Sequence, residues 1–468
     1  MTVRGAVRKS LSALVLGYLM RMLVSAVIAA VALSAVASFA QDTAPVVVAT
    51  AEGRVADIAV FRAEFLGKDK SYAPAARAEA EARLNTLQAT AASVSQVFFE
   101  LEISRIVGLA DNGHTAFFPG PRSRRYNRVE VRLVPFGEEF YVLRTKAQNA
   151  DLLGARLVAI DGKPVAIYRD AARTLAGGTM SWRDRNVGYF LESPDQMHAL
   201  GLVAQSDAAT YRFETRSGGT TERRLVPEPA NPDRPRANAE RWLSPEPMAA
   251  EGGEWRAALP ASAAPWSLRD PEAPFRWRGA PELNAIVIDM RQNNDAEKQT
   301  IQSFLDDMVR AIKAQRAQHV VLDMRLNGGG DLNTTRDFMQ ALPKLVPGKL
   351  LVLTSPWTFS AAISSVGYLK QAAPQRVTII GEPVGDRLNF FSEGSVVTLP
   401  NSQAEMLNAT ERHDYATGCR GYRDCHEPVV RHPIAVPTLA PDVAAPWTIV
   451  DYLAGRDPAM EAAAVALR

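Results

Sequence analysis

Three short segments of the chain contain residues whose types and spacing could support nucleophilic chemistry. The first, Val321–Asp331, is an apolar run that ends in the glycines Gly328, Gly329 and Gly330 before Asp331. Glycines at a strand end let the backbone approach a ligand closely and direct amide N–H groups towards it. A phosphate-binding loop would need Gly-Lys-Ser/Thr, and the carboxylate that follows here would repel phosphate. The segment therefore favours an oxyanion hole, with an ordinary glycine turn as the alternative.

The second segment contains a serine at a predicted junction between a strand and a helix. Ser360 follows the apolar run Leu350–Leu353 and precedes a helix that is predicted to continue through Leu369. The free amides and the positive dipole end of a helix N-terminus favour negative charge at such a position. A serine that only caps the helix would produce the same pattern.

The third segment, Ala110–Thr115, places His114 in a loop after a long helical region. With a pKa near 6.5, an imidazole is a suitable general base for a serine hydroxyl. Without further context, a loop histidine is more often a solvated surface residue. The three segments therefore gain weight only when they are considered together.

The order of these segments resembles that of the tail-specific (C-terminal processing) serine protease family, which includes the tricorn core and the retinoid-binding interphotoreceptor proteins. The family's markers are Asp-Gly-His-Thr, Asp-x-Arg-x-Asn-x-Gly-Gly, Thr-x-Ser-Ala and Gly-Glu-Pro, followed by a closing segment. In this chain they stand, in order, as Asn112–Thr115, Asp323–Gly329, Thr358–Ala361, Gly381–Pro383, and then Pro441–Val443 with Asp451–Pro458. The resemblance covers the chain from the helical region onward, except for a proline-rich stretch.

The resemblance implies an α/β fold: a ClpP/crotonase-like core with an N-terminal helical segment and an inserted PDZ-like β-rich domain. It also implies that Ser360 is the nucleophile. The oxyanion hole would come from the amides of Gly328 or Gly329 together with that of Ala361.

The general base is where this chain departs from the processing proteases of the family. They carry a lysine shortly after Gly-Glu-Pro, whereas this place reads Gly385-Asp386-Arg387 here, and arginine stays protonated. The tricorn-like branch uses the histidine of the first marker, so the resemblance assigns the base to His114.

A carboxylate would have to fix the tautomer of that histidine. Glu393 is the predicted partner, and Glu382 and Asp331 are expected near the site as well. Any of the three could instead be a solvated or capping group.

The elements that must position these residues follow from periodicity. Residues 41–126 form a predicted helical region, with one apolar face made by Leu84, Leu87, Ala91, Val94, Phe98 and Leu101. Residues 127–227 alternate as strands do and contain a tight Asp161-Gly162 turn, which resembles the turn of PDZ-like modules.

The remainder of the chain divides into a connector and a core. Residues 228–281 are rich in proline, with 11 of the chain's 30 prolines between Pro227 and Pro281, which favours an extended surface connector. Residues 282–468 contain short apolar runs separated by amphipathic stretches, a pattern typical of a largely parallel sheet covered by helices.

Composition excludes several classes of function. The chain has 468 residues with 53 Lys+Arg and 51 Asp+Glu, so its net charge is only +2. A nucleic-acid-binding protein would need a basic face. The chain has two cysteines and six histidines, and none of them is spaced as in a zinc motif, so no metal centre and no cofactor are predicted.

The first 40 residues predict an export signal. Basic residues precede an apolar run that ends Ser38-Phe39-Ala40, which indicates cleavage after Ala40. An uncleaved membrane anchor is the alternative. Export to the periplasm or the medium would allow Cys419 and Cys425 to pair as a structural disulfide.

Together these patterns predict an exported serine hydrolase, specifically a peptidase acting on peptides or proteins through Ser360, with His114 as base. Two alternatives stay open. One is a catalytically silent protein that binds a peptide or an apolar ligand on the same scaffold. The other is an acyl hydrolase that prefers esters to peptides. The oligomeric state does not follow from the sequence.

Overall fold

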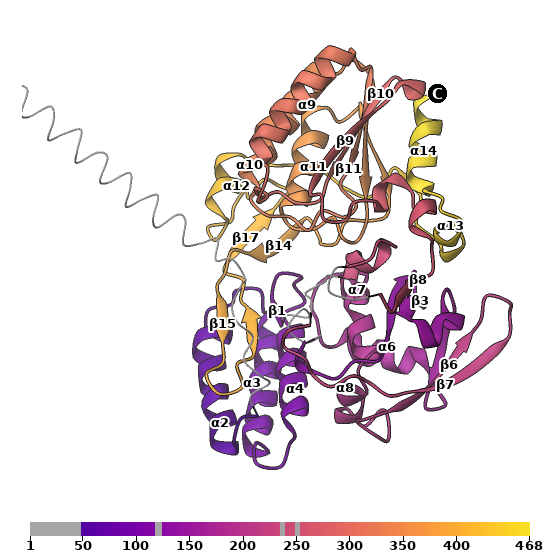
Figure 1. The fold of residues 1–468 in the computed structure, drawn as a ribbon. Coiled ribbons are helices and arrows are strands. Elements are labelled where there is room, and N and C mark those ends of the chain that lie inside the picture. The colour runs from indigo at the N-terminus through magenta and orange to yellow at the C-terminus, as the bar shows by residue number, and fades with distance from the viewer. Residues whose placement is uncertain (1–47, 118–123, 235–238, 249–252) are drawn as a thin grey trace, which may run out of the picture. The chain divides into compact units, whose positions relative to one another are not determined.

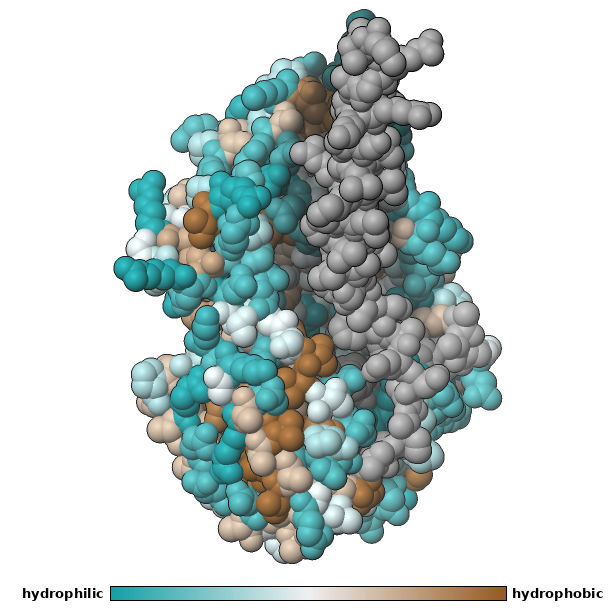
Figure 2. Space-filling view, turned by 90° about the vertical axis from the view of Figure 1, so that its left-hand side faces the viewer, coloured by the Kyte–Doolittle hydropathy of each residue, from teal (hydrophilic) through white to brown (hydrophobic). Residues whose placement is uncertain are grey.

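The computed structural model describes residues 48–117, 124–234, 239–248 and 253–468 (Figure 1). The predicted export signal, residues 1–40, lies outside these ranges. No helix within them is long and apolar enough to cross a bilayer. On the face shown in Figure 2, hydrophilic residues predominate, and apolar residues gather in patches in the lower part of the view.

A six-stranded sheet forms the core in the order β18-β13-β12-β11-β10-β9, and all its neighbouring strands run parallel except β9 and β10. Its strands are β9 (Phe275–Ala280), β10 (Ala285–Met290), β11 (His319–Asp323), β12 (Leu350–Thr354), β13 (Val377–Gly381) and β18 (Val443–Ala444). This arrangement confirms the predicted α/β class. Because β11 and β12 are adjacent and parallel, the loops that follow them lie side by side at the carboxyl edge of the sheet.

Helices cover both faces of this sheet (Figure 1). Side chains alternate across a strand, so Ile286 and Ile288 pack on one face and Val287 on the other. The helices on the first face are α9 (Ile301–Gln315), α10 (Asn333–Leu345) and α11 (Ala361–Ala372), and α14 (Pro458–Leu467) lies on the second.

The predicted helical region consists of several helices. They are α2 (Ala51–Val60), a π-helix (Phe61–Leu66), α3 (Pro74–Ala89) and α4 (Gln96–Gly108). A hairpin from the C-terminal half, β15 (Val396–Thr398) and β16 (Glu405–Leu407), packs its apolar side chains against them. The short strand β1 (Ala116–Phe117) extends this hairpin by pairing with β16. The pairing ties the end of the helical region to the C-terminal half of the chain.

The β-rich domain contains a seven-stranded sheet. Its strands are β2 (Val131–Phe136), β3 (Glu139–Lys146), β4 (Arg156–Ile160), β5 (Lys163–Pro164), β6 (Ala209–Glu214), β7 (Thr220–Leu225) and β8 (Trp255–Ala257), and its helices are α6 (Val165–Arg173), α7 (Met180–Leu191) and α8 (Pro194–Ala199). Asp161 and Gly162 both have positive φ and join β4 to β5. The two-residue hairpin turn therefore forms where the sequence predicts it.

Residues 228–281 are not only a surface connector, because they contribute two strands and buried side chains. Strand β8 pairs with β3 of the β-rich sheet, and β9 is the edge strand of the core sheet. Trp242 and Leu243 are buried in an apolar cluster with residues of the β-rich domain and the core. The prolines prevent long helices here, but the segments between them form short strands and contribute buried side chains.

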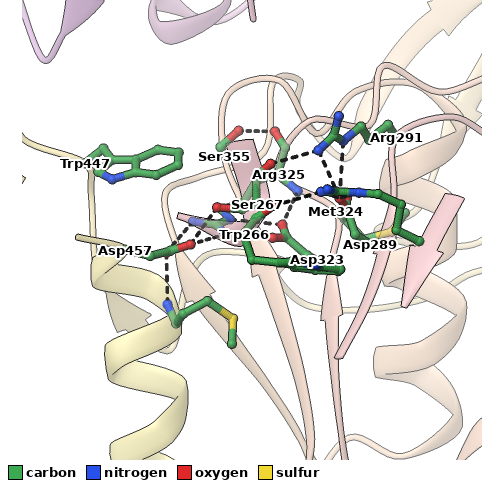
Figure 3. Close-up of polar contacts among 12 residues, drawn as sticks. Trp266, Ser267, Asp289, Arg291, Asp323, Met324, Arg325, Ser355, Trp447 and Asp457 are labelled. Atoms are coloured by element: carbon green, nitrogen blue, oxygen red, sulfur yellow. Dashed lines mark hydrogen bonds and ion pairs between the residues drawn. The ribbon is translucent and has the colours of Figure 1, made fainter. Parts of the chain in front are cut away.

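A buried ionic network lies at the end of β11 (Figure 3). Arg325 binds Asp323 through Nη2 at 2.6 Å and Asp457, the N-cap of α14, through Nη1 at 2.7 Å. Although burial acts in the opposite direction, the Arg325 charge and its hydrogen bonds hold the pKa of Asp457 below its usual value. The second and last family markers are thus joined by one guanidinium. Such a buried pair is costly to break because a lone charge would remain.

The C-terminal half also contains a small two-stranded sheet, formed by β14 (Asn389–Ser392) and β17 (Glu411–Asp414), and the short helices α12 (Glu427–Arg431) and α13 (Ile449–Leu453). The predicted disulfide between Cys419 and Cys425 is confirmed, with Cα atoms 6.2 Å apart. It closes the loop that leads from β17 to α12.

Candidate active site

Ser360 lies at the turn between β12 and α11. Its backbone has φ 55° and ψ −128°, a conformation that is rare for a residue with a side chain. Such strain persists only where the surroundings impose it, and it is concentrated at functional sites. Here Thr358 Oγ1 donates to the Met324 carbonyl at 2.9 Å, and the Phe359 amide donates to the Asn327 carbonyl at 3.0 Å. These bonds attach the Ser360 turn to the loop that follows β11.

The glycine loop lies directly against Ser360. A Cβ atom placed on Gly329 would come within 2.6 Å of the Ser360 Cβ and 3.0 Å of the Ala361 nitrogen. Gly329 also has φ 101°, which disfavours any residue with a side chain. The predicted oxyanion residues and the predicted nucleophile are therefore neighbours in the structure.

The amides of this loop are not equivalent. The Gly329 N–H donates to Asn327 Oδ1 at 2.9 Å, so it is already engaged. Within the described ranges, the Gly328 and Ala361 amides make no hydrogen bond. Of the three predicted donors, these two have no hydrogen-bond partner among the described residues.

Two buried asparagines hold the loop in place: Asn327, which the second marker contains but to which the sequence assigned no role, and Asn293, which the sequence did not single out. Asn327 Nδ2 donates to Asn293 Oδ1 at 3.0 Å, and Asn293 Nδ2 donates to the Ala361 carbonyl at 3.1 Å. Both side chains are fully buried. The glycine loop and the first turn of α11 are thereby fixed to each other. An apolar residue at either position would leave several buried polar groups without partners.

His114 lies beside the Ser360 turn although the two residues are far apart in the sequence. Its imidazole stacks on the ring of Phe359, the residue before Ser360, with centroids 4.3 Å apart, and on Phe390 of β14 at 4.8 Å. Trp182 of α7 stacks on the opposite face of Phe359 at 3.5 Å. The predicted base is thus held between two aromatic rings, buried rather than solvated as an isolated surface histidine would be.

Asp386 is the carboxylate that faces His114. Its Oδ2 lies 3.4 Å from His114 Nδ1, and both side chains are buried. Neither ring nitrogen of His114 makes a hydrogen bond with the described residues, and neither does Asp386 Oδ2. A buried carboxylate at Nδ1 with an unpaired Nε2 is the arrangement expected of an imidazole that is oriented to accept a proton. Asp386 stands in the stretch where processing proteases carry their lysine, and sequence reasoning used that stretch only to exclude Arg387.

The other predicted carboxylates have different contacts. Glu393 Oε1 lies 3.4 Å from His413 Nε2. Asp331 Oδ1 accepts from the Asn333 amide at 2.8 Å at the start of α10. Neither of these two contacts involves His114.

Arg387, in the stretch where the processing proteases carry a lysine, binds Asp111. Its guanidinium donates to the carbonyl of Asp111 at 2.7 Å and to the Asp111 carboxylate at 2.9 Å. The arginine therefore anchors the start of the His114 loop. This contact explains how a residue that cannot serve as a base still helps to build the site.

The Asn112 side chain also holds the His114 loop. Its amide accepts from the Phe391 N–H at 3.0 Å and donates to the Phe391 carbonyl at 2.9 Å, as a neighbouring strand would. On the other side of His114, β1 pairs with β16. The histidine loop is thus attached at both ends to segments that follow Ser360 in the sequence.

Ser360 and His114 are not joined by a hydrogen bond in the described part of the chain. Catalytic hydrogen bonds often tighten only when a substrate is bound. The stacking of His114 on Phe359 places the two side chains in the same region, and the unpaired Nε2 leaves the imidazole free to accept a bond.

A cavity of about 220 Å³ lies beside the Ser360 turn. Residues 354–357, which precede that turn, form part of its wall, together with Arg185 of α7, Arg325, Glu382 and Trp447. Burial raises the pKa of Glu382 to about 7, and the Arg325 charge offsets this rise only in part. The cavity therefore contains a carboxyl group that titrates near neutral pH.

This carboxyl group should make the stability of the protein depend on pH. Between an ordinary pKa of 4.5 and the folded-state value of about 7, the unfolded chain loses the proton while the folded chain keeps it. The free energy of unfolding should therefore fall as pH rises through this window, by up to about 3 kcal/mol. Glu382→Gln should remove this contribution.

The check is denaturant unfolding of the wild type and Glu382→Gln at pH 5 and pH 8. The variant should gain stability relative to the wild type at the higher pH. If the difference between the two proteins is the same at both pH values, Glu382 does not titrate in this window.

Comparisons with known proteins show the fold. No family model and no curated sequence matches the chain. Among solved structures, the chain resembles mature CPAF complexed with lactacystin, with a TM-score of 0.55 at 12% identity over 89% of this chain and 98% of that one. A second structure of mature CPAF has a TM-score of 0.54 at 12% identity over 86% and 95%. CPAF is related to the tail-specific proteases, so the predicted fold is confirmed at this low identity.

Proposed function

We propose that the chain is an exported serine peptidase of the tail-specific protease type, with Ser360 as nucleophile, His114 as general base and Asp386 as the carboxylate that orients it. Asp386 takes the role that the sequence assigned to Glu393. The observation that carries the proposal is the position of the buried His114 imidazole, with Asp386 at Nδ1, Nε2 unpaired and Phe359 against its ring.

The chemistry follows from this geometry. The Ser360 hydroxyl attacks the substrate carbonyl and its proton passes to His114 Nε2, while the negative charge on Asp386 stabilises the imidazolium. The amides of Gly328 and Ala361 donate to the oxyanion, and the N-terminal end of α11 adds its positive dipole. His114 then returns the proton to the leaving amine, and water releases the acyl group by the same route.

Several features support the finer parts of the proposal. The Cys419–Cys425 disulfide is typical of an oxidising compartment and so supports export. The hairpin at Asp161-Gly162 supports a PDZ-like identity for the β-rich domain. CPAF, which has the same fold, is described in complex with lactacystin, so this compound is a second ligand to test for binding to the chain.

The test is labelling of the full mature chain with a fluorophosphonate probe, which reacts with activated serines. The wild type should be labelled and Ser360→Ala should not, while Ser364→Ala, a matched change in the same helix, should keep the label if it folds. Equal labelling of the wild type and Ser360→Ala would contradict the proposal.

Two other outcomes identify the alternatives. No labelling of a folded wild type would indicate a silent binding protein. Labelling with turnover of p-nitrophenyl acetate but not of fluorescein-labelled casein would indicate an esterase.

A further inference from the structure

Three side chains from separate parts of the C-terminal half meet next to β14 and β17. They are Glu393, His413 and His426, and their ligand-type atoms all lie within 4.8 Å of one another. Their spacing in the sequence matches no zinc motif, which is why the sequence predicted no metal centre. The cluster is separate from the proposed catalytic residues: the Phe390 ring lies between His114 and His413, with centroids 4.8 Å and 5.0 Å away.

His413 is the centre of this cluster. Its side chain is only 4% exposed, and its Nε2 makes no hydrogen bond with the described residues. The other ring nitrogen, Nδ1, lies 2.9 Å from the Tyr415 hydroxyl. The Glu393 carboxylate lies at ion-pair distance from this nitrogen, and a cation held between the two groups would satisfy both.

The separation of one pair of ligand atoms matches that around a small ion, and the three atoms all lie within 4.8 Å of one another. His413 Nε2 and Glu393 Oε1 are 3.4 Å apart. Two ligands at roughly 2.0–2.1 Å from a tetrahedral zinc ion lie about 3.3 Å from each other. The Glu393 side chain is 42% exposed, so an ion could enter from solvent and keep a water molecule as its fourth ligand.

The third ligand is oriented in the way metal-bound histidines are. His426 Nδ1 lies 2.6 Å from Glu411 Oε2, which leaves Nε2 for an ion. A carboxylate on the distal nitrogen fixes the tautomer and makes the imidazole a stronger ligand. The His426 ring stacks on His413 with centroids 5.1 Å apart.

The disulfide explains how His426 comes to lie here. Cys425, which forms the disulfide with Cys419, directly precedes His426. The backbone of Cys425 pairs with that of Arg412 of β17 in an isolated β-bridge, and the His426 amide donates to the Arg412 carbonyl at 2.9 Å. The positively charged Arg412 side chain alternates with Glu411 and His413 along β17, so it lies on the other face of the strand. The cluster therefore contains two imidazoles and one carboxylate, with the Glu411 carboxylate on the distal nitrogen of His426.

We propose that Glu393, His413 and His426 bind one divalent transition-metal ion of the zinc type. Imidazole ligands favour zinc and its neighbours over magnesium and calcium, which prefer oxygen ligands. The ion joins β14, β17 and the disulfide loop. The proposal does not depend on the proposed catalytic function, because that function assigns acyl transfer to Ser360, His114 and Asp386.

The experiment is titration of metal-free, untagged mature protein with Zn²⁺ by calorimetry, and with Co²⁺ followed by visible absorption. The wild type should bind one ion per chain, and the cobalt form should show the intense ligand-field bands of a four- or five-coordinate site. His413→Gln and His426→Gln should lose more affinity than Glu411→Gln, for which the expected loss is about 10–100-fold. His198→Gln, which changes a histidine of the β-rich domain, is the matched control and should bind as the wild type does.

Glu393→Gln keeps the test decisive if a histidine variant does not fold, because this exposed side chain can change without disturbing the core. It should also lose Zn²⁺ affinity. Replacing Cys419 and Cys425 by serine should weaken binding, since His426 would be held less firmly. The proposal is wrong if the wild type does not bind Zn²⁺, or if His413→Gln, His426→Gln and Glu393→Gln bind it as tightly as the wild type.

Discussion

Replacing His114 with alanine should reduce hydrolysis of a peptide substrate by about 10⁶-fold, as should Ser360→Ala, because both groups are needed for the same proton transfer. The double variant should be no slower than either single variant, since groups that act as a unit are not additive. The measurement is the initial rate of cleavage of fluorescein-labelled casein by the mature protein.

The comparison also tests whether the two residues act together. Losses that multiply in the double variant would mean that His114 and Ser360 contribute independently. An unchanged rate in a folded His114→Ala protein would show that another group is the base. His432→Ala changes a histidine outside the site and controls for loss of imidazole as such.

Replacing Asp386 with asparagine should reduce the same rate by about 10⁴-fold. An amide at this position can stabilise the wrong tautomer of His114 and no longer balances the imidazolium charge. The matched control is Asp331→Asn, which makes the same change in a residue whose carboxylate accepts from the Asn333 amide and has no contact with His114. This variant should retain its activity, because the side-chain oxygen of asparagine can accept the same bond.

Glu393→Gln decides between the two carboxylates. The structure places Glu393 next to His413 and Asp386 next to His114. A loss near 10⁴-fold for Glu393→Gln, with Asp386→Asn almost fully active, would restore the assignment made from the sequence. Measuring the rates with and without added Zn²⁺ separates this effect from any contribution of the proposed metal site.

Local patterns were sufficient to predict most of the core. The apolar runs at residues 285–288, 320–322, 350–353 and 377–380 all lie in strands of one largely parallel sheet. Alternation and 3.6-residue periodicity arise within a few neighbouring residues, so they can be read without tertiary information. The Asp161-Gly162 hairpin was predictable for the same reason.

The proline-rich stretch shows where local patterns were insufficient. Prolines indicate where helices cannot continue, but not which short segments between them are buried. Burial of Trp242 and Leu243 depends on the β-rich domain and the core against which they pack. The sequence of residues 228–281 has no periodicity that would indicate the apolar cluster in which these side chains are buried.

The histidines illustrate the same limit at the level of chemistry. Motif order assigned a function to His114 but gave none to His413 or His426, because they occur in no recognisable spacing. They become neighbours only when β17 pairs with β14 and the disulfide returns the chain to β17. Contacts between distant residues depend on strand pairing and loop closure, which the sequence does not display locally.

The sequence by itself determined that this chain has an α/β core, where the glycine loop and Ser360 stand at the ends of two strands, and that Arg387 stands in the stretch where the processing proteases that it resembles carry a lysine. Only the tertiary structure decided that Asp386 faces His114, that the Gly329 amide is engaged by Asn327, and that two further histidines meet a glutamate. The reason is physical: side-chain periodicity is a local property of the chain, whereas the pairing of a carboxylate with an imidazole depends on how separate elements pack.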